Sequence, residues 1–314
     1  MTASSDSKSS LFAYTPDFVS VYEVSLRDGL QNEAVTVPTT RKLRLLEALV
    51  DAGLRRVEIT SFVSPKWVPQ LADAEEVVSL APDVDGVQYS ALCPNARGLE
   101  RAKSSGIHEI GVFISASETH NRKNVNKTVA DTLRTFEDVI RPAVESDIRV
   151  RGYVSTLWGC PYEGRIDPRR GLEIAKNLVS QGCYQISLGD TIGVGTPRQT
   201  RDIVAMFLDE LPSEKLALHL HDTRGTALAN VLVGLEMGIR TFDASVAGLG
   251  GCPYAPGAAG NLATEDLVYT LHGMGIATGI DLDRLWEAGQ VAEAIVGREL
   301  PGKVHRAGVR SLRR

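Results

Sequence analysis

The chain has 314 residues, of which 43% are hydrophobic and 23% are charged, and its formal net charge is −5. This composition is that of an ordinary globular protein, and the negative charge argues against binding to nucleic acid or to an anionic membrane surface. No apolar run approaches the roughly 18–20 residues that a membrane-spanning helix needs. The four cysteines are widely spaced, without a Cys-x-x-Cys pair: Cys93, Cys160, Cys183 and Cys252. This spacing argues against a disulfide framework and favours a reducing, cytoplasmic location.

The two ends of the chain differ in composition from the region between them. The start, MTASSDSKSS, is polar and serine-rich and lacks the apolar core of a secretory signal, so we expect a disordered leader over residues 1–17. The final sequence, VHRAGVRSLRR, is basic, and it predicts a flexible tail over residues 299–314. Nothing between residues 18 and 298 reads as a linker, which predicts one domain over that range.

Short β-rich runs alternate with longer amphipathic segments along most of the chain. The predicted strands are 18–25, 55–60, 87–93, 109–116, 148–155, 183–189, 216–221 and 241–248. The predicted helices are 41–53, 95–106, 126–146, 168–182, 197–211, 225–238, 262–275 and 281–297. Glycines that can serve as helix C-caps lie near the ends of four of them: Gly106, Gly182, Gly238 and Gly275.

The alternation predicts parallel strands joined by right-handed crossovers. Eight units over about 260 residues match a (β/α)8 TIM barrel, with residues 281–297 as a C-terminal helical extension. The alternative is an open doubly wound sheet. That fold usually has fewer units and a glycine-rich phosphate loop after its first strand, whereas here Arg27, Asp28 and Gly29 follow that strand.

Polar side chains gather where the predicted strands end, which is the side of a TIM barrel that carries the active site. They follow or close all eight strands: Arg27, Asp28, Glu58, Asn95, Ser115, Ser117, Tyr153, Ser155, Asp190, His219, His221, Cys252 and Asn261. Because eight separate strands bring such residues to one rim, the pattern is stronger evidence for an active site there than any single motif.

A metal site is the sharpest local expectation. His219 and His221 are two residues apart in a predicted strand, so both face the same side, about 7 Å apart, and can bind one cation. Asp28 is the candidate anionic ligand and Asn261 a fourth. The alternatives are a hydrogen-bonded histidine pair, a turn residue at Asp28, and a helix N-cap at Asn261. Two nitrogen and two oxygen ligands suit Mg²⁺ or Mn²⁺, whereas Zn²⁺ usually takes more nitrogen and sulfur.

The segment VAGLGGCPYAPGAAGN, residues 246–261, follows the last predicted strand and is rich in glycine. A loop of this composition on the active rim can close over a substrate. Cys252 would then lie near the cation, a setting that favours a reactive thiol; the alternative is a small apolar loop residue. The same tetrapeptide, GCPY, recurs at 159–162, so the tetrapeptide alone does not identify a catalytic cysteine.

Together the motifs resemble those of the 3-hydroxy-3-methylglutaryl-CoA (HMG-CoA) lyase family, over residues 18–298. The matching stretches are VSLRDGLQNE (24–33), EITSFVSPKWVPQ (58–70), RGYVS (151–155), GCPYEG (159–164), SLGDTIGVGTP (187–197), HLHDT (219–223) and AGLGGCPYAPGAAGNLATEDLVY (247–269). The wider group comprises metal-dependent TIM-barrel lyases and Claisen-type synthases. The resemblance implies cleavage of HMG-CoA to acetyl-CoA and acetoacetate, as in leucine degradation and ketone-body formation, by a homodimer or other homo-oligomer.

The resemblance also implies a role for each candidate residue. The metal ligands would be Asp28, His219, His221 and Asn261. The catalytic residues would be Arg27, Asp28, Cys252, His219, Glu58 and Asp190. Asn124, within NRKNVN, matches a segment that contacts coenzyme A.

These residue types suit the expected chemistry. A cation that chelates the C3 hydroxyl and a carboxylate oxygen lowers the pKa of that hydroxyl. Arg27, a permanent cation, can stabilise the enolate that forms at the thioester, and Cys252 can protonate the leaving carbanion. Either Asp28 or His219 can take the hydroxyl proton.

One position departs from the family pattern. Arg224 precedes Gly225 where an aromatic residue is expected, so it either pairs with Asp222 or reads a different acyl group. The alternatives are therefore a lyase for a longer 3-hydroxy-3-alkylglutaryl-CoA and a Claisen-type synthase, which usually has a longer C-terminal region. A non-enzymatic CoA-binding barrel is a third alternative. It predicts that the reactive residues have been replaced, whereas all of them are present here.

Overall fold

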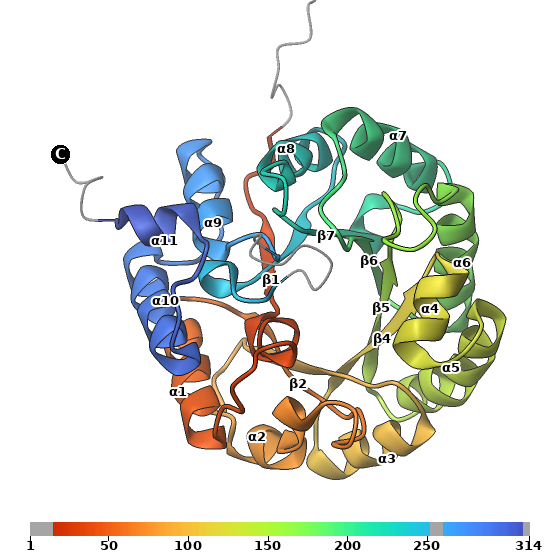
Figure 1. The fold of residues 1–314 in the computed structure, drawn as a ribbon, viewed down its shortest axis with the longest axis horizontal. Helices are drawn as coiled ribbons and strands as arrows, with labels where there is room; N and C mark the ends of the chain where they lie inside the picture. Colours follow the sequence, from red (N-terminus) through yellow and green to blue (C-terminus); the bar gives the residue numbers. More distant parts are fainter. Residues whose placement is uncertain (1–14, 252–259, 310–314) are drawn as a thin grey trace, which may run out of the picture.

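The computed structural model describes residues 15–251 and 260–309. Eight parallel strands close into a barrel in sequence order, from β1 to β8, and helices surround it (Figure 1). The TIM barrel predicted from the sequence is therefore confirmed. In the described ranges, no helix has the length and apolar character that crossing a membrane requires.

The strands are short, as is usual for this fold. They are β1 (Ser20–Glu23), β2 (Arg56–Ser61), β3 (Gln88–Leu92), β4 (Glu109–Ser115), β5 (Arg149–Ser155), β6 (Gln185–Asp190), β7 (Leu216–Leu220) and β8 (Thr241–Ala244). The helices are α1 (Thr39–Asp51), α2 (Ala74–Leu80), α3 (Ala96–Ser105), α4 (Glu118–Val125), α5 (Val129–Val144), α6 (Pro168–Gln181), α7 (Pro197–Leu208), α8 (Ala227–Glu236), α9 (Thr264–Gly273), α10 (Leu282–Val296) and α11 (Lys303–Ala307).

Local sequence accounts for most of the element boundaries. The four glycines expected near helix ends all have positive φ: 79° at Gly106, 127° at Gly182, 94° at Gly238 and 77° at Gly275. Helices α2 and α4 were not predicted. Helix α2 is only 7 residues long, and α4 is mostly polar in sequence, so neither has a clear apolar stripe.

The first strand ends earlier than the sequence suggested, at Glu23 instead of residue 25. Ser25–Gly29 forms a single π-helical turn, which we call η1, and the backbone amides of Arg27, Asp28 and Gly29 all donate to the carbonyl of Val24, at 3.2, 2.8 and 3.2 Å. π-Turns are rare and are often found at functional sites. Here the turn places Arg27 and Asp28 directly on the rim of the barrel.

The last predicted strand is also shorter, because Val246–Gly248 forms a 3₁₀ turn, η4, after β8. Ala247 in this turn has a φ of 52°, in the left-handed region that residues with a Cβ seldom adopt. The turn begins the glycine-rich segment 246–261, of which residues 252–259 lie outside the described ranges.

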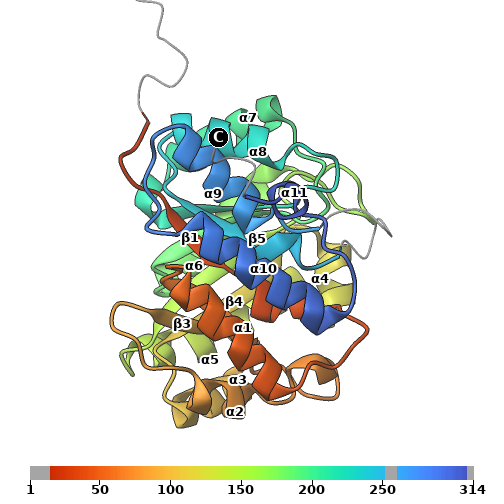
Figure 2. The same cartoon turned by 90° about the vertical axis from the view of Figure 1, so that its left-hand side faces the viewer.

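The predicted helical extension is present as α10, which packs beside α1 on the outside of the barrel (Figure 2). The flexible tail predicted over residues 299–314 is wrong for its described part. Residues 303–307 form α11, and Leu300 and His305 are buried, at 0% and 3% exposure. The basic composition of this segment suggested a free tail, but its backbone amides and buried side chains contact residues that are distant in the sequence. Residues 310–314 lie outside the described ranges, as do residues 1–14 of the predicted leader.

Candidate active site

Three potential metal-ligating side chains meet at the C-terminal rim of the barrel. One ligand atom from each of Asp28, His219 and His221 lies within 4.8 Å of the other two. The Nε2 atoms of the two imidazoles are 3.2 Å apart. Asn261 is the fourth predicted ligand, and its Nδ2 atom donates to Asp28 Oδ2 at 2.9 Å. The structure thus brings all four predicted ligands together.

The backbone explains this convergence. His219 lies in β7 and His221 directly follows it, and alternate residues of a strand face the same side. His221 also forms an isolated antiparallel bridge with Asn261, which fixes the returning end of the segment after β8 beside β7. Asp28 reaches the same place from the π-helical turn after β1.

The protonation states suit a cation. Burial favours a neutral Asp28, but the adjacent guanidinium of Arg27 outweighs it and lowers the pKa of Asp28 to about 2. Burial, together with the neighbouring His219, lowers the pKa of His221 to about 3. At neutral pH, Asp28 is therefore an anion and His221 a neutral imidazole, the forms that bind metal. Two imidazole nitrogens with carboxylate and amide oxygens fit a divalent ion.

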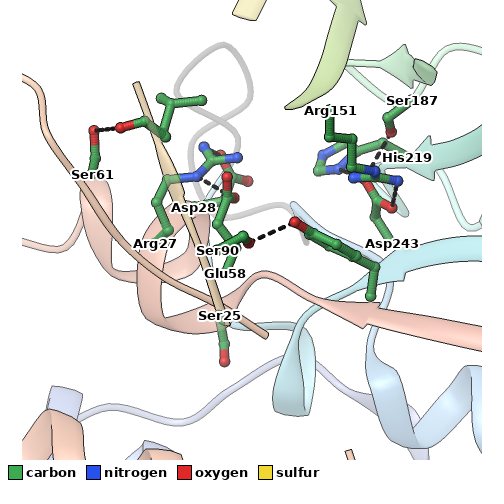
Figure 3. Close-up of polar contacts among 12 residues, drawn as sticks. Ser25, Arg27, Asp28, Glu58, Ser61, Ser90, Arg151, Ser187, His219 and Asp243 are labelled. Atoms are coloured by element: carbon green, nitrogen blue, oxygen red, sulfur yellow. Dashed lines mark hydrogen bonds and ion pairs between the residues drawn. The ribbon is translucent and has the colours of Figure 1, made fainter. Parts of the chain in front are cut away.

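A buried ionic network fixes the orientation of His219. Its Nδ1 atom lies 3.2 Å from Oδ2 of Asp243 in β8, whose ionised carboxylate makes Nδ1 the protonated nitrogen and leaves Nε2 free as a ligand. Arg151 donates to both oxygens of Asp243, at 3.0 and 2.6 Å, and Ser187 Oγ donates to Oδ2 at 2.8 Å. Figure 3 shows these three side chains converging on Asp243.

Sequence reasoning missed this network. Arg151 is fully buried inside the barrel, where its guanidinium also stacks on Tyr22, 4.1 Å from the ring centroid. The available signal was a charged residue in the interior of each of two strands, Arg151 in RVRGYVS and Asp243 in TFDA. Buried charges need partners, so an arginine and an aspartate in different strands of one barrel were candidates for a pair.

Asp243→Asn is expected to weaken divalent-metal binding by about 10- to 100-fold, because the amide no longer enforces the tautomer of His219. It is also expected to destabilise the fold by about 3–5 kcal/mol, because Arg151 loses its buried counter-ion. Titration with Mn²⁺ followed by electron paramagnetic resonance measures the first effect, and urea unfolding the second. Ser187→Ala, which keeps the carboxylate, is the matched control. Wild-type Mn²⁺ affinity in Asp243→Asn would show that Asp243 does not orient the ligand.

Arg27 is held rigidly beside the metal-ligand cluster. Its Nε atom donates to Glu58 Oε2 and its Nη1 atom to Asp28 Oδ1, both at 2.5 Å, and its side chain is 5% exposed (Figure 3). Burial disfavours the guanidinium charge, but Glu58 and Asp28 outweigh that cost and raise the pKa of Arg27 above its ordinary value. The site therefore presents a permanent, buried cation whose position two carboxylates fix.

The other predicted site residues have different surroundings. Asp190 at the end of β6 is fully buried and accepts the backbone amides of Val194 and Gly195, at 3.0 and 2.8 Å, so it shapes the loop after β6. Asn124 is exposed on α4. Cys252 lies outside the described residues. The chemical roles of these three residues stay predictions.

Arg224 does not pair with Asp222, so that alternative from the sequence is wrong. Its Nη1 atom donates to the carbonyls of Ile192 and Gly193, at 2.8 and 3.2 Å, and so joins the loops that follow β6 and β7. The carboxylate of Asp222 is instead paired with Lys303 of the C-terminal segment.

Comparison with known proteins gives one consistent result. The HMGL-like family model matches residues 19–292. Rat mitochondrial hydroxymethylglutaryl-CoA lyase is 51% identical over 292 residues, which cover 93% of this chain and 90% of the relative. The structure of hydroxymethylglutaryl-CoA lyase from Pseudomonas aeruginosa has a TM-score of 0.91 at 47% identity, covering 93% and 98% of the two chains. An HMG-CoA lyase from Acinetobacter baumannii, solved with coenzyme A and 3-methylmalate, has a TM-score of 0.89 at 40% identity, covering 94% and 96%. The chain belongs to the HMGL-like family.

Proposed function

We propose that this protein is a divalent-metal-dependent carbon–carbon lyase that cleaves HMG-CoA to acetyl-CoA and acetoacetate. The observation that carries the proposal is the convergence of Asp28, His219, His221 and Asn261 beside the buried cation of Arg27. The family relatives named as HMG-CoA lyases support the choice of substrate.

The four ligands would hold Mg²⁺ or Mn²⁺. A divalent ion at this position would supply a Lewis acid that lowers the pKa of the C3 hydroxyl of the substrate. The protein keeps Asp28 ionised and His221 neutral, and Asp243 holds His219 with its Nε2 atom free. Asp28 and His219 are both candidates for the base that takes the hydroxyl proton.

Arg27 would stabilise the enolate that develops when the C2–C3 bond breaks. Because Glu58 and Asp28 already fix the guanidinium, it needs little reorganisation when negative charge appears on the thioester oxygen. We propose that Cys252 protonates the carbanion carbon. That assignment depends on the family resemblance alone, since Cys252 lies outside the described residues.

We propose that coenzyme A binds along α4, near Asn124. An open surface cavity of about 530 Å³ lies between the end of α4 and α5, and its lining includes Arg122, Lys127 and Arg134 together with the carboxylates of Asp131 and Asp138. Such cations suit the phosphates of coenzyme A. The Acinetobacter baumannii relative was solved with coenzyme A, which supports an acyl-CoA substrate. We also propose a cytoplasmic homo-oligomer that acts in leucine degradation or ketone-body formation.

The decisive assay measures acetoacetate after the purified protein is incubated with HMG-CoA and Mg²⁺. We expect product that disappears with a chelator and returns with Mg²⁺ or Mn²⁺. Activity that is indifferent to the chelator, or the absence of product, would refute the proposal. Longer 3-hydroxy-3-alkylglutaryl-CoA esters in the same assay test the alternative acyl group, and net condensation of acetyl-CoA with a keto acid tests a synthase.

A further inference from the structure

A segment close to the C-terminal end of the described residues crosses the rim beside the candidate active site. We call residues 298–306 the C-terminal strap; they include the start of α11, which lies next to α9 and α10 (Figure 1). We propose that this strap is a positioning element for the metal site, because it contacts the segments that carry Asp28 and His221 and also the turn η4, and that Lys303 is its main positioning residue. The inference depends on the proposed metal-dependent function and extends it to residues outside the site.

The strap first contacts the segment that carries Asp28. Arg298 at its start forms an ion pair with Glu33, five residues after Asp28, and Arg298 Nε lies 3.1 Å from Glu33 Oε2. Glu33 is buried, at 8% exposure. The pair therefore ties the middle of the connection between β1 and α1 to the strap.

The second contact is with η4, where the glycine-rich segment begins. The amide of Gly302 donates to the carbonyl of Ala247 at 2.8 Å, while Glu265 Oε2 accepts the amide of Ala247 at 2.7 Å. Ala247 has a φ of 52°, and a strained residue persists only where its surroundings fix it. A Cβ on Gly302 would lie 3.0–3.1 Å from backbone atoms of Ala247, so only glycine allows this approach without a shift.

The third contact reaches the segment that carries His221, which is itself hydrogen-bonded to the segment that carries Asn261. Lys303 Nζ pairs with Asp222, which directly follows His221. The amide of Asp222 donates to the carbonyl of Gly260 at 2.7 Å, and Gly260 directly precedes Asn261. Asp222 is 8% exposed; its Oδ1 atom accepts the amide of Ala227 at 3.0 Å, and Lys303 supplies the compensating positive charge.

The base of the strap is itself firmly held. Asp266 at the start of α9 accepts the amides of Lys303 and Val304, at 3.1 and 2.6 Å, and Asp266 is 4% exposed. Lys303 is therefore presented to Asp222 from a fixed backbone. Its own side chain is 64% exposed, so replacing it removes the link without opening the core.

Together these contacts join the strap to the segments of Asp28 and His221 and to η4, and Asp222 in turn is bonded to Gly260 beside Asn261. Ligands on separate segments bind a cation tightly only when their relative positions are set in advance, because otherwise binding must pay for ordering them. Loosening the strap should therefore weaken metal binding while the barrel stays folded.

The test compares Lys303→Met with the wild type in three measurements: Mn²⁺ affinity by electron paramagnetic resonance, thermal unfolding, and amide hydrogen exchange of residues 246–251 and 260–263 without metal. We expect a loss of Mn²⁺ affinity of about two- to fivefold, the effect of one partly exposed ion pair. We also expect faster exchange in both segments and an unchanged melting temperature. Lys303→Arg should restore both affinity and exchange.

Two matched controls accompany it. Lys176→Met removes the exposed Lys176–Glu210 pair, which is 2.7 Å long and remote from the site. It should change neither the Mn²⁺ affinity nor the hydrogen-exchange rates. Gly302→Ala should loosen η4 because its Cβ meets Ala247, whereas Gly273→Ala, with nothing within 4 Å of an added Cβ, should not.

Wild-type exchange and wild-type Mn²⁺ affinity in both Lys303→Met and Gly302→Ala would overturn the strap proposal, as would an equal loss in Lys176→Met. The proposed function fails separately. If the wild-type protein binds Mn²⁺ but does not cleave HMG-CoA, the proposed function is wrong, and the Mn²⁺ affinities of the variants still test the strap proposal. If the wild type binds no Mn²⁺, the exchange rates alone judge whether the strap orders the ligand segments.

Discussion

Arg27→Gln is expected to lower kcat for HMG-CoA cleavage by at least two to three orders of magnitude while leaving Mn²⁺ bound. Removing one fixed donor to a developing oxyanion typically costs about 3–4 kcal/mol. Here the lost group is also a buried charge that no water molecule replaces equally. Steady-state kinetics and Mn²⁺ titration of the same preparation measure the two quantities side by side.

The positions around Arg27 supply its controls. Arg27→Lys keeps the positive charge, but an ammonium group lacks the planar fork that contacts Glu58 and Asp28 together. We therefore expect Arg27→Lys to have a kcat between those of Arg27→Gln and the wild type. Arg101→Gln removes a remote arginine whose Nε is also 2.5 Å from a carboxylate, that of Glu75, and should leave kcat unchanged. Loss of Mn²⁺ in Arg27→Gln would mean that Arg27 organises the ligands instead of acting on the enolate.

Asp28→Asn is expected to reduce Mn²⁺ affinity by at least 100-fold and to abolish turnover at ordinary metal concentrations. The pKa of Asp28, about 2, keeps this carboxylate ionised at any working pH, so it is the negative ligand of the set. Asparagine has nearly the same shape and removes the charge alone. Isothermal titration with Mn²⁺ measures the affinity, and partial recovery of activity at high Mn²⁺ would show that the site is weakened and not destroyed.

Asp190→Asn is the matched control on the same rim. Asp190 accepts backbone amides of its own loop and does not belong to the ligand cluster, so its amide variant should keep the metal affinity of the wild type. The assignment of Asp28 as a ligand is wrong if Asp28→Asn binds Mn²⁺ normally, or if Asp190→Asn loses as much affinity.

Much of the architecture was predictable because it depends on local patterns. Alternation of strand and helix periods predicts a parallel barrel, and the rim of such a barrel follows from where each strand ends. His219 and His221 were expected to share a face because strand geometry repeats every two residues. Their convergence with Asp28 and Asn261 then required only that the strand ends meet, and the structure brings these residues together.

The features that the sequence did not predict all depend on contacts between distant residues. The Arg151–Asp243 pair joins positions 92 residues apart, and the link from Lys303 to Asp222 joins positions 81 residues apart. The π-turn after β1 packs against β2 and η4. The basic C-terminal composition pointed to a free tail, yet backbone amides and one lysine hold that segment on the rim. By itself the sequence determined the barrel, its reactive rim and the chemistry of the ligands. Only the tertiary structure decided which buried charges are paired and what holds the ligands, since those free energies come from desolvation and proximity that no local pattern records.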